Sequence, residues 1–153
     1  MTRHAAAPDL SELMPHSGRM RLLSHVVEHR AERTVCAVDV AQSDLFHDAD
    51  GGVPAWVGLE YMAQCVAAHS GLVTRHRGGP PQRGLFLGTR STEFFVDRFE
   101  PGQTLRVSST HLRGEQTLVW FDCSIEDAKQ GALLARGRLS VYAMRSQEAA
   151  DGP

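Results

Sequence analysis

The segment between Pro54 and Leu72 constrains the fold more than any other part of the chain. It predicts a helix with apolar residues on every side, and such a helix is buried in a protein core. Pro54 suits a first helical turn, and either Gly71 or the Gly-Gly-Pro-Pro run at 78–81 ends the helix. After this segment the apolar residues recur with a period of two, which is typical of strands. The pattern therefore predicts one buried helix packed against a sheet.

Two segments before the helix and four after it have the alternation and the β-branched residues of strands. This order predicts an α+β fold, in which a curved antiparallel sheet wraps around one long buried helix. Such a sheet covers only part of an apolar helix, so we expect a dimer to cover the rest. The predicted strands are 22–27, 34–40, 94–98, 104–112, 118–126 and 133–143, and a short helical turn at 9–14, capped by Asp9 or Ser11, precedes them.

Length and charge narrow the class of protein. The 153 residues suit a single domain, which we place at 9–145 with flexible tails at 1–8 and 146–153. A formal charge of −2 argues against a nucleic-acid binder. The start of the chain lacks the apolar region of a secretory signal, and the apolar stretch 53–73 contains Pro54 and Glu60, which make it a poor membrane span. We therefore expect a cytoplasmic protein that binds no membrane.

The cysteines and histidines predict no metal site. Cys36, Cys65 and Cys123 are odd in number and far apart, so we expect buried free thiols, as in a reducing cytoplasm. His25 and His29 fall on a predicted strand and its turn, where their spacing does not direct both toward one metal. His69, near the end of the helix, is expected to be packed or to cap it.

Glu60 is the only charged residue between Pro54 and Val73. One interpretation is a buried carboxyl with a raised pKa, which a general acid at neutral pH requires. The other is a carboxylate on a helix face that reaches solvent or a salt bridge. Gln64, one turn later, can hydrogen-bond Glu60 or a substrate, or can contact a second subunit.

The start of the same helix offers backbone amides. The first amides of a helix lack intrahelical partners and can hold a carbonyl oxygen on which negative charge develops. Gly52 leads into this start, and we expect the amides near Ala55 and Trp56 to bind such an oxygen. Because Glu60 lies about one and a half turns further on, an acid and an oxyanion site can share one pocket.

Three blocks of the chain resemble the β-hydroxyacyl-[acyl-carrier-protein] dehydratases of the hot-dog fold. They are L-M-P-H-S-G-R-M-R-L-L at 13–23, V-P-A-W-V-G-L-E-Y-M-A-Q at 53–64 and F-F-V-D-R-F-E-P-G-Q-T-L at 94–105. They occur in family order over residues 10–143. The second block is the most specific, and it is similar to the ApeP-like branch that serves aryl-polyene pigment synthesis.

The resemblance implies that the chain converts a β-hydroxyacyl thioester into a trans-2-enoyl thioester. It gives Glu60 the role of acid and His16, in the L-P-H block, the role of base. The fatty-acid enzymes carry their base in a G-H-F-P-G motif, whose position here is Phe46 with His47 beside it, so His47 is the alternative base and a candidate substrate-binding residue. The sequence leaves open whether the base and the acid come from one subunit or two.

The resemblance also implies the partners. The substrate would be carried on the phosphopantetheine arm of an acyl carrier protein, with no metal or redox cofactor, and the dimer would be a homodimer or a heterodimer with a second hot-dog dehydratase. A stretch without acidic residues, 61–92, supplies a candidate docking surface for the carrier, although solvated loop charge explains its arginines equally well. These arginines are Arg75, Arg77, Arg83 and Arg90.

Two other functions fit the sequence. A hot-dog acyl thioesterase would use a helix carboxylate to activate water. A non-catalytic subunit would only complete the dimer of an active dehydratase; the missing G-H-F-P-G motif favours this idea, whereas His16 and Glu60 argue against it.

Overall fold

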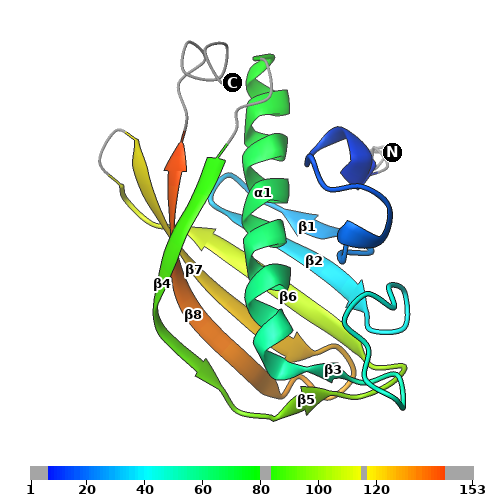
Figure 1. The fold of residues 1–153 in the computed structure, drawn as a ribbon. Helices are drawn as coiled ribbons and strands as arrows, with labels where there is room; N and C mark the ends of the chain where they lie inside the picture. Colours follow the sequence, from blue (N-terminus) through cyan, green and yellow to red (C-terminus); the bar gives the residue numbers. More distant parts are fainter. Residues whose placement is uncertain (1–6, 80–83, 115–116, 144–153) are drawn as a thin grey trace, which may run out of the picture.

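The computed structural model describes residues 7–79, 84–114 and 117–143, in which a curved antiparallel sheet packs on one side of a long helix (Figure 1). The helix, α1 (Gly58–Arg77), lies across the concave face of the sheet. This arrangement confirms the predicted α+β architecture. The sheet order is β1 (His25–His29), β2 (Arg33–Asp39), β6 (Thr104–His111), β7 (Leu118–Asp127), β8 (Leu133–Ala143) and β4 (Gly84–Phe94).

The helix starts and ends later than its first signals suggest. A single 3-10 turn, η3 (Ala55–Val57), precedes α1. The helix continues through Gly71 and ends at Gly78, whose φ of 74° suits a glycine. Gly71 has a different role, because a Cβ at this position would lie 2.2 Å from the carbonyl oxygen of Leu13. Gly71 thus permits the close approach of the N-terminal segment, and its prediction as a helix end was wrong.

Most predicted strands are confirmed with shifts of a few residues at their ends, but the strand predicted at 94–98 is wrong. Strand β4 ends at Phe94, residues 95–97 form a bend, and β5 (Arg98–Phe99) pairs instead with β3 (Val53–Pro54). The sequence also gave no sign of β4 itself, because an edge strand that is exposed along its length needs no alternation of apolar and polar residues. The interval after α1 therefore contains far less loop than expected.

The N-terminal segment folds as two 3-10 turns beside α1 (Figure 1). The first, η1 (Leu10–Glu12), is capped by the Asp9 carboxylate, which accepts a hydrogen bond from the Ser11 amide, as predicted. The second, η2 (Gly18–Met20), precedes β1. Leu10, Leu13 and Met14 are buried in the common core, so this segment is an integral part of the domain.

One stripe of α1 and the free edge of β4 stay partly open to solvent. Leu59, Glu60, Ala63 and Ala67 are only partly buried, and β4 exposes three successive apolar side chains at 85–87. These surfaces are where the expected second subunit would pack. Within the described residues, no helix combines the length and the apolar character that a membrane span requires.

Candidate active site

The structure brings His16 and Glu60 together in a single chain. The His16 Nε2 atom lies 3.6 Å from the Glu60 Oε1 atom. Glu60 stands in the first turn of α1, and His16 stands in the segment between η1 and η2. The two side chains are 28% and 40% exposed, so both are open to a bound molecule. The imidazole and the carboxylate are thus adjacent within one chain.

Gln64 connects this pair to the N-terminal segment. Its Nε2 atom donates to the Glu60 Oε1 atom (2.9 Å) and to the Met20 carbonyl oxygen (2.7 Å). Its Oε1 atom accepts a hydrogen bond from the Leu22 amide (2.9 Å). The side chain is fully buried, and its bond to the Leu22 amide is shielded from water, whereas the other two bonds reach partly exposed residues. Of the predicted roles, contact with Glu60 is confirmed, and its burial leaves Gln64 no surface for substrate or a second subunit in this chain.

The structure distinguishes between the two interpretations of Glu60, an enclosed carboxyl and a carboxylate that reaches solvent or a salt bridge. Its carboxylate is not enclosed by apolar groups; it is partly exposed and hydrogen-bonded, which is the second of the two interpretations. Within the described residues, the Oε2 atom of Glu60 accepts no hydrogen bond and forms no ion pair, so this oxygen is free to contact a bound molecule. The His16 Nδ1 atom is buried and has no hydrogen-bond partner among the residues that the structure describes.

His47, the alternative base, is held by its own loop. Its Nε2 atom lies 2.6 Å from the carbonyl oxygen of Val40, and its amide donates to the carbonyl oxygen of Asp44. Because a carbonyl oxygen only accepts, the Nε2 atom donates this hydrogen bond, which leaves Nδ1 as the ring nitrogen able to accept a proton. Among the two candidates, the structure pairs only His16 with Glu60.

The amides at the helix start are less free than predicted. The Ala55 amide donates to the Asp97 carbonyl oxygen (3.0 Å), and the Gly52 amide donates to the Asp50 carboxylate (3.0 Å). Both expectations of an open amide are therefore corrected. The Trp56 amide has no acceptor outside its own helix within the described residues, so it is the remaining candidate for an oxyanion contact.

Arg98 fixes the loop that leads into this helix. Its guanidinium occupies the space where a Cβ of residue 52 would lie, so any larger residue there would require Arg98 to move. It hydrogen-bonds Asp50 and forms longer ion pairs with Asp48 (3.6 Å) and Glu100 (3.8 Å). The hydrogen bond from Arg98 holds the pKa of the Asp50 carboxyl well below its usual range. These ion pairs attach the loop to β5.

An exposed aromatic pair, Phe46 and Trp56, was missed in the sequence. Their ring centroids are 5.9 Å apart with a T-shaped angle of 78°. In the sequence, Phe46 marks only the position of the family's missing histidine, and Trp56 is a candidate only through its backbone amide. No spacing rule joins a loop residue to a helix start ten positions later, so the contact required the structure.

The three described arginines of the predicted docking surface lie on two different elements. Arg75 pairs with Glu12 of η1, and Arg77 is exposed in the last turn of α1. Arg90 lies on β4 and stacks over the ring of Trp120, with its Cζ atom 5.4 Å from the ring centroid. Arg83 lies outside the described residues. The expectation that these arginines lie in a loop is therefore wrong for Arg75, Arg77 and Arg90, which lie on a helix and a strand.

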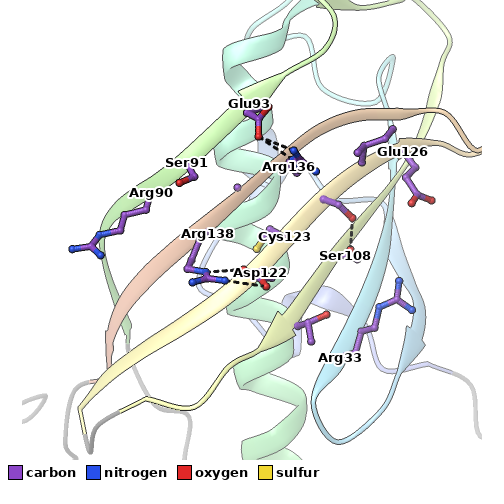
Figure 2. Close-up of a pocket in the computed structure, with 14 residues that line it drawn as sticks. Arg33, Arg90, Ser91, Glu93, Ser108, Asp122, Cys123, Glu126, Arg136 and Arg138 are labelled. Atoms are coloured by element: carbon purple, nitrogen blue, oxygen red, sulfur yellow. Dashed lines mark hydrogen bonds and ion pairs between the residues drawn. The ribbon is translucent and has the colours of Figure 1, made fainter.

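Arg90 also lines a cleft of about 780 Å³ on the outer face of the sheet, opposite α1 (Figure 2). Figure 2 shows that its charged side chains largely neutralise one another, since Arg136 pairs with Glu93 and Arg138 pairs with Asp122. His16 and Glu60 do not line this cleft. It is therefore separate from the candidate active site.

A buried histidine lies two and a half turns beyond Glu60. The His69 Nδ1 atom is 2.8 Å from the Thr34 hydroxyl, which lies 2.8 Å from the Nδ1 atom of His29. His69 is 3% exposed, which confirms the prediction of a packed residue. Burial, followed by the nearby His29 and His111, lowers the pKa of His69 to about 4.

The cysteines are buried free thiols, as predicted, and burial raises the pKa of the Cys123 thiol well above its usual range. Within the described residues, no three His, Cys, Asp or Glu side chains are grouped so that they could hold a metal ion.

Comparisons with known proteins bear on the fold and the family. Among solved structures, the dehydratase heterocomplex ApeI:P from Xenorhabdus doucetiae is similar with a TM-score of 0.82 and 27% identity, over 92% of this chain and 94% of that chain. AziG of S. sahachiroi (TM-score 0.61, 17% identity, 79% and 90% covered) and a hypothetical thioesterase with coenzyme A from Streptococcus pneumoniae TIGR4 (0.59, 14%, 78% and 84%) share the fold.

These similarities confirm the hot-dog fold. A search of curated protein sequences finds no match. The family model described as ApeP dehydratase matches residues 8–151. Because that match spans nearly the whole chain, the protein belongs to the ApeP-like family of dehydratases.

Proposed function

We propose that this dehydratase removes water from a β-hydroxyacyl thioester carried by an acyl carrier protein and releases the trans-2-enoyl thioester. The observation that carries the proposal is the pairing of His16 with Glu60 at 3.6 Å in a chain of this family. The reaction needs one group that accepts a proton from the α-carbon and one that gives a proton to the departing hydroxyl. The pair supplies both.

In the proposed reaction, bound substrate displaces water from the partly exposed Glu60 and favours its protonated form. Neutral His16 then takes the α-proton at Nε2, and Glu60 donates its proton from Oε2 to the β-hydroxyl. The C–H and C–O bonds break, the α,β double bond forms and water leaves. The products of these transfers are an imidazolium and a carboxylate 3.6 Å apart. Once the product has left, transfer of the proton through solvent from His16 to the Oε2 atom of Glu60 restores the starting state for the next substrate.

Gln64 supports the division of labour between the two carboxyl oxygens. Because it donates to Oε1, that oxygen is the acceptor of the pair, and the proton of the acid resides on Oε2. The thioester oxygen gains negative charge as the α-proton leaves, and in this proposal the Trp56 amide at the helix start donates a hydrogen bond to it. The proposed reaction uses no metal or redox cofactor, since dehydration changes no oxidation state overall.

The partners follow from the same proposal. The ApeI:P structure is a complex of two dehydratases, and this chain, 27% identical, is proposed to pair with a second hot-dog dehydratase. The partly open stripe of α1 and the exposed apolar side chains of β4 support such a contact. Repeated dehydration during growth of a polyene chain is the proposed biological setting.

The test is a dehydration assay on the purified chain with a β-hydroxyacyl thioester, alone and with its carrier or second subunit. Enoyl absorbance should appear, and His16→Asn should lower kcat by at least about 100-fold, the lower range for a general base. His47→Asn is the matched control and should stay within about threefold of the unaltered protein. Loss of turnover in His47→Asn with an active, folded His16→Asn would overturn the assignment.

The same assay separates the rival functions. Free thiol in place of enoyl absorbance identifies a thioesterase. Turnover only after the second subunit is added, unaffected by His16→Asn, identifies a non-catalytic subunit. Faster turnover of the carrier-bound thioester than of a short pantetheine thioester supports the carrier protein as partner.

A further inference from the structure

The Trp56 side chain is 61% exposed, more than any other large apolar side chain among the described residues. It does not project freely, because Phe46 packs edge-on against the indole (5.9 Å, 78°) and is itself partly buried against the core. An exposed aromatic surface held in place by a partly buried neighbour is suited to bind a ligand. The aromatic pair Phe46–Trp56 is therefore a candidate binding surface.

The position of the pair indicates which occupant. Trp56 precedes Glu60 by four residues, and the side chains of this helix that retain exposure, from Trp56 through Leu59, Glu60 and Ala63, form one stripe. The rise per residue in α- and 3-10 helices places the two levels about 6–8 Å apart along the axis. An acyl chain a few carbons long spans that distance from a β-carbon held at Glu60.

On the basis of the proposed function, we propose that the aromatic pair Phe46–Trp56 determines substrate specificity by stacking on a planar, conjugated acyl group beyond the β-carbon. Conjugation keeps such a group flat, so its π surface can lie on the indole without losing conformational freedom. A saturated chain is flexible and presents no π surface. The pair would thus favour substrates that already contain double bonds or an aromatic ring near the site of dehydration.

Two thioesters of N-acetylcysteamine test this selectivity, because they differ by one double bond: the 3-hydroxy-5-phenylpent-4-enoyl and the 3-hydroxy-5-phenylpentanoyl compounds. For Trp56→Leu, we expect kcat/KM on the conjugated compound to fall about three- to tenfold, the range of an aromatic pair. On the saturated compound the fall should be less than about twofold. Comparing each variant with the unaltered protein on one substrate removes the intrinsic difference in reactivity.

Matched variants make the result specific. Trp56→Phe retains an aromatic face and should restore most of the selectivity. Trp120→Leu is the control, since it removes the only other tryptophan, on the outer face of the sheet under Arg90, and should change neither substrate. Equal losses on both compounds would overturn the proposal. So would a change in oligomeric state of Trp56→Leu in size-exclusion chromatography, because the indole would then be a subunit contact.

Binding is tested separately from turnover. In a Trp120→Phe protein, Trp56 is the only tryptophan, so its fluorescence reports on the site. Saturable quenching by the conjugated enoyl thioester, and not by the saturated acyl thioester, supports the aromatic pair Phe46–Trp56. This holds even if the unaltered protein turns over neither hydroxyacyl compound, because absence of turnover refutes only the proposed function. Absence of quenching refutes the aromatic pair.

Discussion

Acidification from pH 7 to pH 5 should destabilise this protein through His69. The ring is 3% exposed and packs edge-on against Phe121, with centroids 5.7 Å apart. The groups that act on it are the imidazoles of His29 on β1 and His111 on β6, both of which oppose a positive charge. Its pKa is accordingly lowered from 6.5 to about 4.

The sign follows from this direction. A base with a folded-state pKa below its unfolded value binds its proton more tightly in the unfolded chain, so stability is complete above pH 6.5 and is lost as the pH falls toward 4. At about 1.36 kcal/mol for each pKa unit, the whole effect is about 3 kcal/mol, of which about 2 kcal/mol falls between pH 7 and pH 5. That is a large part of the stability of a typical domain.

Urea unfolding at pH 7, 6 and 5, followed by far-ultraviolet circular dichroism at one protein concentration, measures this loss. His69→Asn removes the titrating ring and places an amide near the Thr34 hydroxyl, so its free energy of unfolding should change by about 2 kcal/mol less over this range than that of the unaltered protein. Equal pH dependence of the two proteins would refute the reasoning. The comparison uses slopes, so any cavity left by the shorter side chain does not affect it.

Two further predictions concern the attachment of the N-terminal segment. Gln64→Leu leaves the Leu22 amide and the Met20 carbonyl without their hydrogen-bond partners, so the free energy of unfolding should fall by about 2–4 kcal/mol in urea titrations. In the same variant, kcat should change more than KM. An unaltered kcat would contradict the positioning role of Gln64. Gly71→Ala places a Cβ against the Leu13 carbonyl and should cost about 1–3 kcal/mol, whereas Gly88→Ala, with open space around it, should be nearly neutral; thermal unfolding compares them, and similar Tm values would contradict the contact.

Local patterns were enough to predict most of the fold. The apolar helix and the strands of the centre of the sheet, such as β6 and β8, carry periodicity that burial imposes on their residues. The edge strand β4 escaped because it is exposed along its length, and a strand that is not buried on one face has no such periodicity. The end of α1 was ambiguous because Gly71 and Gly78 look alike in sequence, although one permits a close contact and the other a left-handed turn.

The candidate site was only partly predictable for a different reason. Glu60 was singled out as the one charge in an apolar helix, and His16 came from the resemblance to a family. The bonds of Gln64 to Met20 and Leu22 join residues more than forty positions apart, and the Phe46–Trp56 contact joins a loop to a helix. Such contacts depend on how separate elements pack, which periodicity and spacing do not encode.

Contacts of the N-terminal segment explain how His16 and Glu60 come to lie next to each other in one chain. The segment is held on α1 at three levels: Gln64 bonds it near Glu60, Gly71 admits the Leu13 backbone, and Arg75 pairs with Glu12. The buried hydrogen bonds of Gln64 contribute about 1 kcal/mol each, whereas the exposed Arg75–Glu12 pair contributes little. The position of His16 therefore depends chiefly on Gln64 and on the close contact at Gly71. Both residues belong to α1: Gln64 lies about one turn after Glu60, and Gly71 lies about two turns after Gln64. The helix that carries Glu60 therefore also positions His16.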